Sequence, residues 1–148
     1  MGDQSFWGWV SGEQRRVVLC GPLVLKFPKI AWGNGCLSRL RLGLRANQQE
    51  TRFSRTGWPE LCPVVMKVHG GILNVMLRAK PLSDEEWSEF DYESFVARCS
   101  PDDPCCHERM MAAGYAITPA EGLVPAECKR NSFGVLRGRI VAVDYGGG

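Results

Sequence analysis

The chain has 148 residues, 45 % of them hydrophobic, and a formal net charge of +2 at pH 7. This length suits one domain or two small lobes that share an interface, and the hydrophobic content argues against a disordered chain. The sequence contains no run of eighteen apolar residues and no basic-then-apolar leader. We therefore expect a cytoplasmic protein that does not contact membranes.

Charge and cysteine usage refine this expectation. Residues 1–60 hold nine Lys and Arg against four Asp and Glu, whereas residues 61–120 hold five against nine. The protein should therefore present a basic end and an acidic end. The seven cysteines are scattered and no signal peptide precedes them, which favours reduced thiols over a disulfide framework.

The sequence of the first part of the chain predicts a small sheet followed by a helix. We expect a first edge strand within residues 1–13, then a hairpin of strands Arg15–Cys20 and Leu23–Phe27 around a Gly-Pro turn. Lys26 stands in the second arm, where a lysine ordinarily just faces solvent. A second hairpin, with arms at 63–68 and 72–78, is expected before the pattern breaks at 79–82.

The helix is predicted over residues 37–54. Leu37, Leu40 and Leu44 recur at helical spacing and define one face, and Asn47 and Glu50 lie on or beside that face. The remaining surface is basic and could meet an acidic protein surface or nucleic acid. We disfavour nucleic acid because no exposed aromatic residues are interleaved with the basic ones. These basic residues are Arg39, Arg41, Arg45, Arg52 and Arg55.

The acidic part of the chain should be helical. Ser83 and Glu86 form a capping box, which predicts a helix over about 84–98 with Trp87, Phe90 and Phe95 on its buried side. A second helix is expected over 104–113. Four potential metal ligands lie around the loop between these helices, and their spacing leaves zinc, free thiols and a local disulfide open, with free thiols favoured. They are Cys99, Cys105, Cys106 and His107.

Residues 135–143 predict a closing hairpin, because two β-branched runs flank a polar turn at 137–139. The hairpin should bring the polar residues before its first strand beside Asp144, which follows its second strand. A carboxylate at a strand end, next to Glu127, Lys129 and Ser132, suits a site for metal and phosphate.

These residues resemble the centre of the protein-kinase fold. Asp144-Tyr145-Gly146 is similar to the Asp-Phe-Gly step of kinases, and Glu127-x-Lys129-x-x-x-Phe133-Gly134 is similar to their catalytic loop. The resemblance extends more narrowly to small kinase-like proteins of phages and bacterial mobile elements, in which the Glu is usual.

The resemblance implies roles for individual residues and two cofactors, ATP and magnesium. Lys26 would reach the nucleotide phosphates and pair with Glu50, and Asp144 would hold the metal. In the catalytic loop, Glu127 would stand in the place of the catalytic Asp, Lys129 in that of the loop lysine and Ser132 in that of the metal-binding Asn. Two of these loop positions are therefore changed from the kinase pattern.

Two further departures weaken the catalytic interpretation. The Gly-rich loop that covers the phosphates is absent, and the activation segment that follows the Asp-Phe-Gly step in kinases has no counterpart after Gly146. Glu127 is also one methylene longer than Asp, and a displacement of about 1 Å can cost roughly a hundredfold in rate.

We therefore expect an α+β fold in one compact unit: a kinase-like sheet with one packed helix in residues 1–80, then a reduced helical lobe and closing hairpin in 81–148. The favoured function is a non-catalytic, kinase-like protein of phage or mobile-element type, acting in the cytoplasm of a host bacterium. It would bind and inhibit a host protein complex, for instance a bacterial defence component such as a CRISPR effector. The docking residues would be Arg39, Arg41, Arg45 and Arg52. The alternative is a minimal phosphotransferase that depends on magnesium and ATP.

Overall fold

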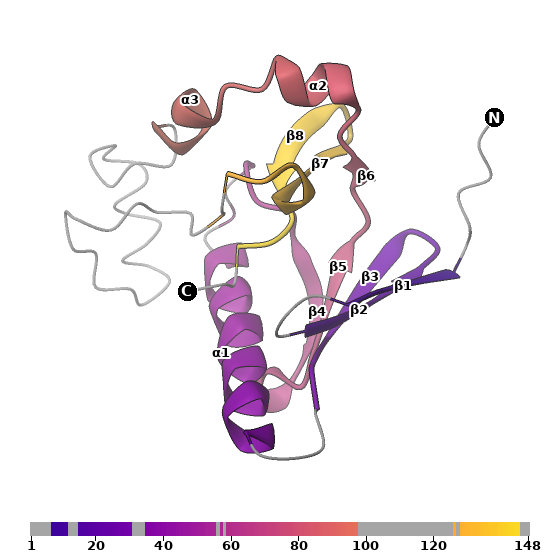
Figure 1. Ribbon diagram of the computed structural model, residues 1–148, viewed down its shortest axis with the longest axis vertical. Coiled ribbons are helices and arrows are strands. Elements are labelled where there is room, and N and C mark those ends of the chain that lie inside the picture. Colours follow the sequence, from indigo (N-terminus) through magenta and orange to yellow (C-terminus); the bar gives the residue numbers. More distant parts are fainter. Residues whose placement is uncertain are drawn as a thin grey trace. The chain divides into compact units, whose positions relative to one another are not determined.

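The structure, a computed structural model, describes residues 7–11, 15–30, 35–55, 57, 59–97, 126 and 128–145. In this part the fold is α+β, as predicted, with a five-stranded antiparallel sheet, helices and a smaller sheet built on a closing hairpin (Figure 1). The chain divides into two compact units. The first is Met1–Thr51 with Pro63–Arg78, and the second is Arg52–Cys62 with Ala79–Gly148.

The first unit contains the five-stranded sheet, whose strand order is β1-β2-β3-β5-β4. All neighbouring strands pair antiparallel, and β4 forms one edge. Both predicted hairpins are confirmed, with a short 3₁₀ turn, η1, in the second one. The elements are β1 (Trp7–Ser11), β2 (Arg15–Cys20), β3 (Leu23–Pro28), β4 (Val64–Val68), η1 (His69–Gly71) and β5 (Leu73–Leu77).

Helix α1 (Cys36–Ser54) confirms the predicted helix, but its buried face differs from the leucine face expected at its start. Leu37 is 69 % exposed, whereas Asn47 and Glu50 are fully buried. Polar side chains of α1 bond to the sheet, and these bonds fix the rotation of the helix more strongly than the leucine spacing does. The leucine face is therefore exposed at Leu37.

The second unit contains a three-stranded antiparallel sheet in the order β6-β7-β8. The predicted hairpin is present, and Arg137 and Gly138 at its turn have positive φ angles of 52° and 77°, which a tight hairpin turn requires. Strand β6 corrects the expectation that the pattern simply breaks at residues 79–82. Pro81 is tolerated there because β6 is an edge strand. The strands are β6 (Lys80–Pro81), β7 (Phe133–Leu136) and β8 (Arg139–Ala142).

The helix expected over 84–98 is two helices, α2 (Asp84–Ser88) and α3 (Tyr92–Ala97). The capping box at the start of α2 is confirmed: Ser83 Oγ accepts from the Glu86 N–H at 3.1 Å, and the Ser83 N–H donates to Glu86 Oε2 at 2.7 Å. Asp91 begins the second helix, because its carboxylate accepts the Ser94 N–H at 3.0 Å. An aspartate in this position is an N-cap, and it separates the two helices.

An aromatic cluster forms the core of the second unit around Phe133, which is 2 % exposed. The ring centroid of Phe133 lies 4.8 Å from that of Phe90 and 5.3 Å from that of Phe95. Trp87 and Tyr92 complete the cluster at 6.2 and 6.1 Å. The buried role expected for Phe95 is therefore confirmed, whereas Trp87 and Phe90 are half-buried members of the cluster. The three residues come from two helices and the link between them.

Several expectations lie outside the described residues. These are the helix over 104–113 and the loop of Cys99, Cys105, Cys106 and His107, so zinc, thiols and a disulfide all stay open there. Four cysteines in the described part form no disulfide: Cys20, Cys36, Cys62 and Cys128. In that same part, no helix is long and apolar enough to cross a membrane.

Candidate functional site

Lys26 and Glu50 form the ion pair that the kinase resemblance implies. The Nζ atom of Lys26, on β3, lies 2.6 Å from Oε1 of Glu50, on α1. Lys26 is only 5 % exposed and Glu50 is fully buried. A charge pair taken out of water in this way holds only if further polar groups surround it.

Arg15 supplies a second cation to the same carboxylate. Its guanidinium Nη1 lies 2.8 Å from Glu50 Oε1 and donates to Asn47 Oδ1 at 3.4 Å. Arg15 lies on β2, at a register position opposite Pro28 of β3, and is itself 8 % exposed. Glu50 therefore links α1 to two neighbouring strands of the sheet through one carboxylate oxygen.

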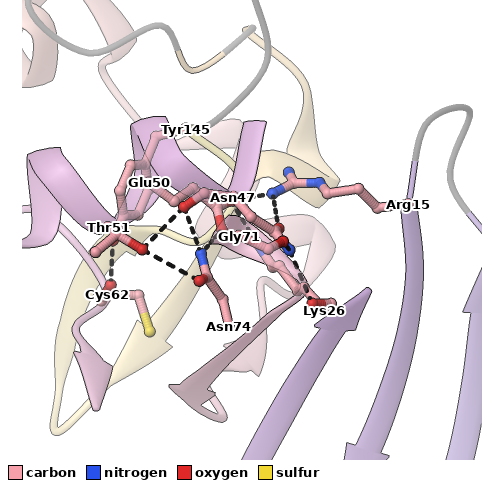
Figure 2. A network of polar contacts seen from close by, with 9 residues as sticks. All are labelled: Arg15, Lys26, Asn47, Glu50, Thr51, Cys62, Gly71, Asn74 and Tyr145. Carbon is pink, nitrogen blue, oxygen red and sulfur yellow. Dashed lines mark hydrogen bonds and ion pairs between the residues drawn. The ribbon is translucent and has the colours of Figure 1, made fainter. Parts of the chain in front are cut away.

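Asn47 fastens α1 to the backbone of the sheet, as Figure 2 shows. Its side-chain amide donates to the carbonyl of Lys26 at 3.1 Å and to that of Gly71 at 2.7 Å. Both amide protons are thus used, and its oxygen accepts from Arg15. Asn47 is fully buried, so each of these bonds is made away from water.

Asn74, on β5, connects the other side of the network (Figure 2). Its amide donates to the main-chain oxygen of Asn47 at 2.8 Å and to Glu50 Oε2 at 3.5 Å. The hydroxyl of Thr51 lies 2.9 Å from the Asn47 oxygen and 3.1 Å from Asn74 Oδ1. Glu50 is thereby held through both of its oxygens.

We name these six residues the buried polar network: Arg15, Lys26, Asn47, Glu50, Thr51 and Asn74. All six are buried, and all belong to the first unit. The sequence indicated Lys26 and Glu50 and noted Asn47, but it missed the other three residues. Asn74 could have been recognised from the sequence, because it is a polar residue within the otherwise apolar segment 72–77.

The second group of candidate residues lies around the closing hairpin, in the second unit. As expected, the hairpin brings Asp144 beside the loop before β7: the carbonyl of Ser132 accepts the Val143 N–H at 2.9 Å and the Asp144 N–H at 3.4 Å. Ser132 ends η2 (Arg130–Ser132) and is 5 % exposed, whereas Asp144 and Lys129 are exposed. Glu127 and Gly146 lie outside the described residues.

Tyr145, beside Asp144, is fully buried. Its hydroxyl donates to the carbonyl of Cys62 at 2.6 Å, and its ring packs edge-on against Phe53 with centroids 6.5 Å apart. The segment that resembles the Asp-Phe-Gly step is thus anchored by its aromatic residue, while the carboxylate before it faces solvent.

The described residues do not form a ready metal centre. Among them, no group of three or more His, Cys, Asp or Glu side chains is placed to hold a metal ion. Asp144 offers one exposed carboxylate, and the Ser132 side chain beside it is buried. The donor set in this part of the chain does not by itself fit a resident magnesium ion.

The predicted docking arginines are all exposed on α1. They do not share one face, because consecutive residues of a helix are rotated by about 100°. Arg41, Arg45 and Arg52 lie within roughly 40° of one another, whereas Arg39 is about 160° away from Arg41. The basic surface therefore consists of one stripe and a separate arginine.

The structure thus describes two groups of candidate residues, each within its own unit. Lys26 and Glu50 are brought together in the first, and Ser132 and Asp144 in the second. Convergence of the two groups on one cleft stays a prediction. No family model, curated protein or solved structure matches the chain. What the fold and the first site define is an α+β protein whose sheet and helix are joined by a buried network of charged and amide side chains.

Proposed function

We propose that the chain is a non-catalytic, kinase-like protein that binds an acidic surface of a host protein complex and inhibits that complex. The observation that carries the proposal is the set of side chains that surrounds the Lys26–Glu50 ion pair. The Glu50 carboxylate also binds Arg15 through Oε1, and the Asn74 amide donates to its other oxygen at 3.5 Å. Lys26 thus helps to hold α1 on the sheet. We infer that its role is structural, whereas the corresponding lysine of kinases contacts the nucleotide phosphates.

The basic stripe of α1 supplies the binding surface in this proposal. Arg41 and Arg45 are exposed and one helical turn apart, and Arg52 continues the same stripe. Arginine side chains present planar donors that pair with carboxylates in two-point contacts, so they suit an acidic protein surface. The resemblance to phage and mobile-element proteins gives the partner class: a complex of the bacterial host, such as a CRISPR defence component.

Capture from bacterial lysate tests the proposal. The wild-type chain is compared with an Arg41→Glu/Arg45→Glu variant, and a protein complex should be retained by the former and lost from the latter. A matched control is Arg16→Glu/Arg139→Glu, which changes the net charge equally at two exposed arginines that are not part of α1. Partners retained equally by all three proteins would contradict docking through the stripe.

The second candidate is a minimal phosphotransferase. One observation favours it: Lys26 and Glu50 pair at 2.6 Å, as the kinase resemblance implies for the residues that position the phosphates. Glu127, Lys129, Ser132 and Asp144 would then complete the site.

Titration with Mg-ATP separates the two functions. Saturable binding together with turnover of labelled ATP that disappears in Asp144→Ala would establish the phosphotransferase. The absence of both a thermal shift and saturable binding would remove it. The non-catalytic function predicts this second result.

A further inference from the structure

Three exposed residues of α1 form one row along its solvent side. Leu37, Arg41 and Arg45 follow one another at a spacing of four residues, which places their side chains next to each other on a helix. Leu37 is 69 % exposed, and both arginines are exposed. Arg41 lies about 180° from the buried Glu50 around the helix axis. We name this row the solvent ridge of α1.

The solvent ridge carries positive charge that the helix itself does not balance. Glu50 is the only acidic residue of α1, and it is buried beside Lys26. The first turn of α1 holds no acidic residue, although the helix dipole favours carboxylates there. Arg41 and Arg45 are like charges at neighbouring positions, which weakens a helix, and among the described residues neither forms an ion pair. The ridge is therefore suited to a ligand that brings carboxylates.

Apolar side chains stand at the same surface. Leu37 occupies the N-terminal end of the ridge, and Leu42, which is 40 % exposed, lies about 60° from Arg45 on the next row. Protein interfaces combine apolar contacts with polar ones around them, and arginine is enriched in them. A phosphate backbone would use the arginines and leave both leucines in water. An amphipathic protein segment with acidic and apolar residues would use all four side chains.

We propose that the solvent ridge is the docking site for an acidic, amphipathic helix of the partner protein. This inference rests on the proposed function and names the kind of partner segment that α1 recognises. A helix fits better than an extended segment, because the backbone groups of α1 are bonded within the helix and offer nothing to an added strand. A helical partner satisfies its own backbone, and rows at four-residue spacing on two helices pack into each other.

The ridge also sets the order of residues in the partner helix. Acidic residues are most favourable near the N-terminus of a helix, so the two carboxylates should come first. The partner then runs antiparallel to α1: its first Glu faces Arg45, its second faces Arg41, and a leucine contacts Leu37. Each guanidinium binds its carboxylate through two parallel hydrogen bonds. The recognised pattern is therefore Glu-x-x-x-Glu-x-x-x-Leu.

A second copy of this chain is a poorer occupant. Its α2 exposes Glu85 and Glu89 at the same four-residue spacing. However, α2 ends at Ser88, and the residue at the third position of the pattern is Glu93 rather than an apolar one. No apolar contact with Leu37 would follow, so we expect the acidic helix on a different protein.

The direct test uses two fluorescein-labelled helical peptides with capped ends, built on alanine and glutamine. In the aligned peptide, two Glu and one Leu follow the recognised pattern, whereas in the control peptide the same residues lie on different faces of the helix. Fluorescence anisotropy at low ionic strength should give about fivefold higher affinity for the aligned peptide, since exposed ion pairs are individually weak. Amide signals of Leu37, Arg41 and Arg45 should shift in the NMR spectrum when it binds. Equal affinity for both peptides, or no binding, would overturn the docked helix.

A pair of charge variants locates the binding surface. Arg41→Gln/Arg45→Gln should lower the affinity for the aligned peptide to that of the control peptide. Arg16→Gln/Arg139→Gln removes equal charge outside α1 and should leave the affinity unchanged. Unchanged binding in the first variant would overturn the docked helix.

The apolar contact has its own pair of variants. Leu37→Gln should lower the affinity for the aligned peptide about threefold, because the burial of an exposed leucine is lost. Ile30→Gln is the control, at a residue that is 57 % exposed outside α1. Equal affinities of these two variants would contradict the predicted contact of the partner leucine. The melting temperatures of all four variants should match the wild type, because the replaced side chains are exposed.

The peptide experiment and lysate capture fail separately. Equal affinity for the two peptides overturns the docked helix, even where capture still depends on Arg41 and Arg45. Binding of the aligned peptide without a captured complex supports the docked helix and contradicts the host complex alone.

Two other ligands are tested on the same proteins. Fluorescein-labelled duplex DNA that binds more tightly than the aligned peptide, and loses this affinity in Arg41→Gln/Arg45→Gln, would overturn the acidic helix in favour of a nucleic acid. A dimer in analytical ultracentrifugation that disappears in the same variant would overturn it in favour of a second copy. We expect neither result.

Discussion

The carboxylate of Glu50 accepts a hydrogen bond from the ammonium of Lys26 at 2.6 Å, and both residues are buried. A buried ion pair is by itself weak evidence of stability, because both charges lose their hydration. Removing one partner is costly, however, and the two partners of this pair differ. Glu50 pairs with two cations, Lys26 and Arg15, whereas its own removal would leave both of them without this carboxylate.

Replacing the two partners should therefore give unequal losses. Glu50→Gln leaves Lys26 and Arg15 facing a neutral amide, and we expect about 3–5 kcal/mol less stability. Lys26→Met leaves Arg15 on the carboxylate, so its loss should be smaller. Urea unfolding of both variants measures the difference. A larger loss in Lys26→Met would show that Arg15 does not hold Glu50 as the geometry indicates.

Asn47→Ala should weaken the attachment of α1 to the sheet. The substitution leaves the carbonyls of Lys26 and Gly71 without the amide that binds them, at about 1–3 kcal/mol for each buried group. Gln48→Ala is the control, because Gln48 is exposed and its bond to Gly70 should contribute no more than about 0.5 kcal/mol. Chemical unfolding measures both values. Similar losses in the two variants would contradict the role of Asn47.

Gly134→Ala should destabilise the second unit. A Cβ atom at this position would lie 2.8 Å from Ala79 Cβ and 2.9 Å from the Lys80 carbonyl, which is too close for either contact. Overpacking of this kind costs about 1–3 kcal/mol. Gly138→Asn is the control, since nothing lies within 4 Å of a Cβ there and asparagine tolerates a positive φ angle. Thermal unfolding should separate the two, and an unshifted melting temperature in Gly134→Ala would refute the close packing of β6 on β7.

The capping box predicts a pH dependence. The Ser83 N–H, which donates to the Glu86 carboxylate, lowers the pKa of Glu86 below its ordinary value of 4.5. A carboxylate whose pKa is lower in the folded state stabilises the fold above the unfolded pKa and loses that effect as the pH falls through the folded pKa. The wild type should therefore exceed Glu86→Gln in melting temperature at pH 7, and the gap should narrow below about pH 4.5.

Glu89→Gln is the matched control for this experiment, because it removes an equal charge from the residue after α2. The difference in melting temperature between the wild type and Glu89→Gln should not narrow in the same way as the pH falls. A gap between wild type and Glu86→Gln that stays constant from pH 7 to pH 3 would rule out the proposed linkage.

Much of the fold could be predicted from the sequence because its signals are local. The turn at Gly21, the hairpin at 137–139 and the capping box at Ser83 each depend on neighbouring residues. Strand β6 was missed, since it has two residues and exists only through pairing with β7, over 50 positions later. The break after α2 could have been recognised from Asp91, whose side chain caps the next helix.

The candidate site was predictable only in part. The Lys26–Glu50 pair followed from the kinase resemblance, and its geometry confirms the contact. The contacts of Arg15 and Asn74 with Glu50 could not be predicted. They depend on how the strands pair in the sheet, and local sequence does not encode this pairing. The rotation of α1 depends on the same bonds, which explains why Leu37 faces solvent.

The bond from Tyr145 to Cys62 spans 83 positions of the chain. The backbones of Cys62 and Ala142 are also bonded, so the segment 59–62 is completed by residues made much later. During synthesis the five-stranded sheet has all its strands once residue 77 has left the ribosome, whereas the second unit must wait for residues 133–145. The first unit therefore has the opportunity to fold well before the second.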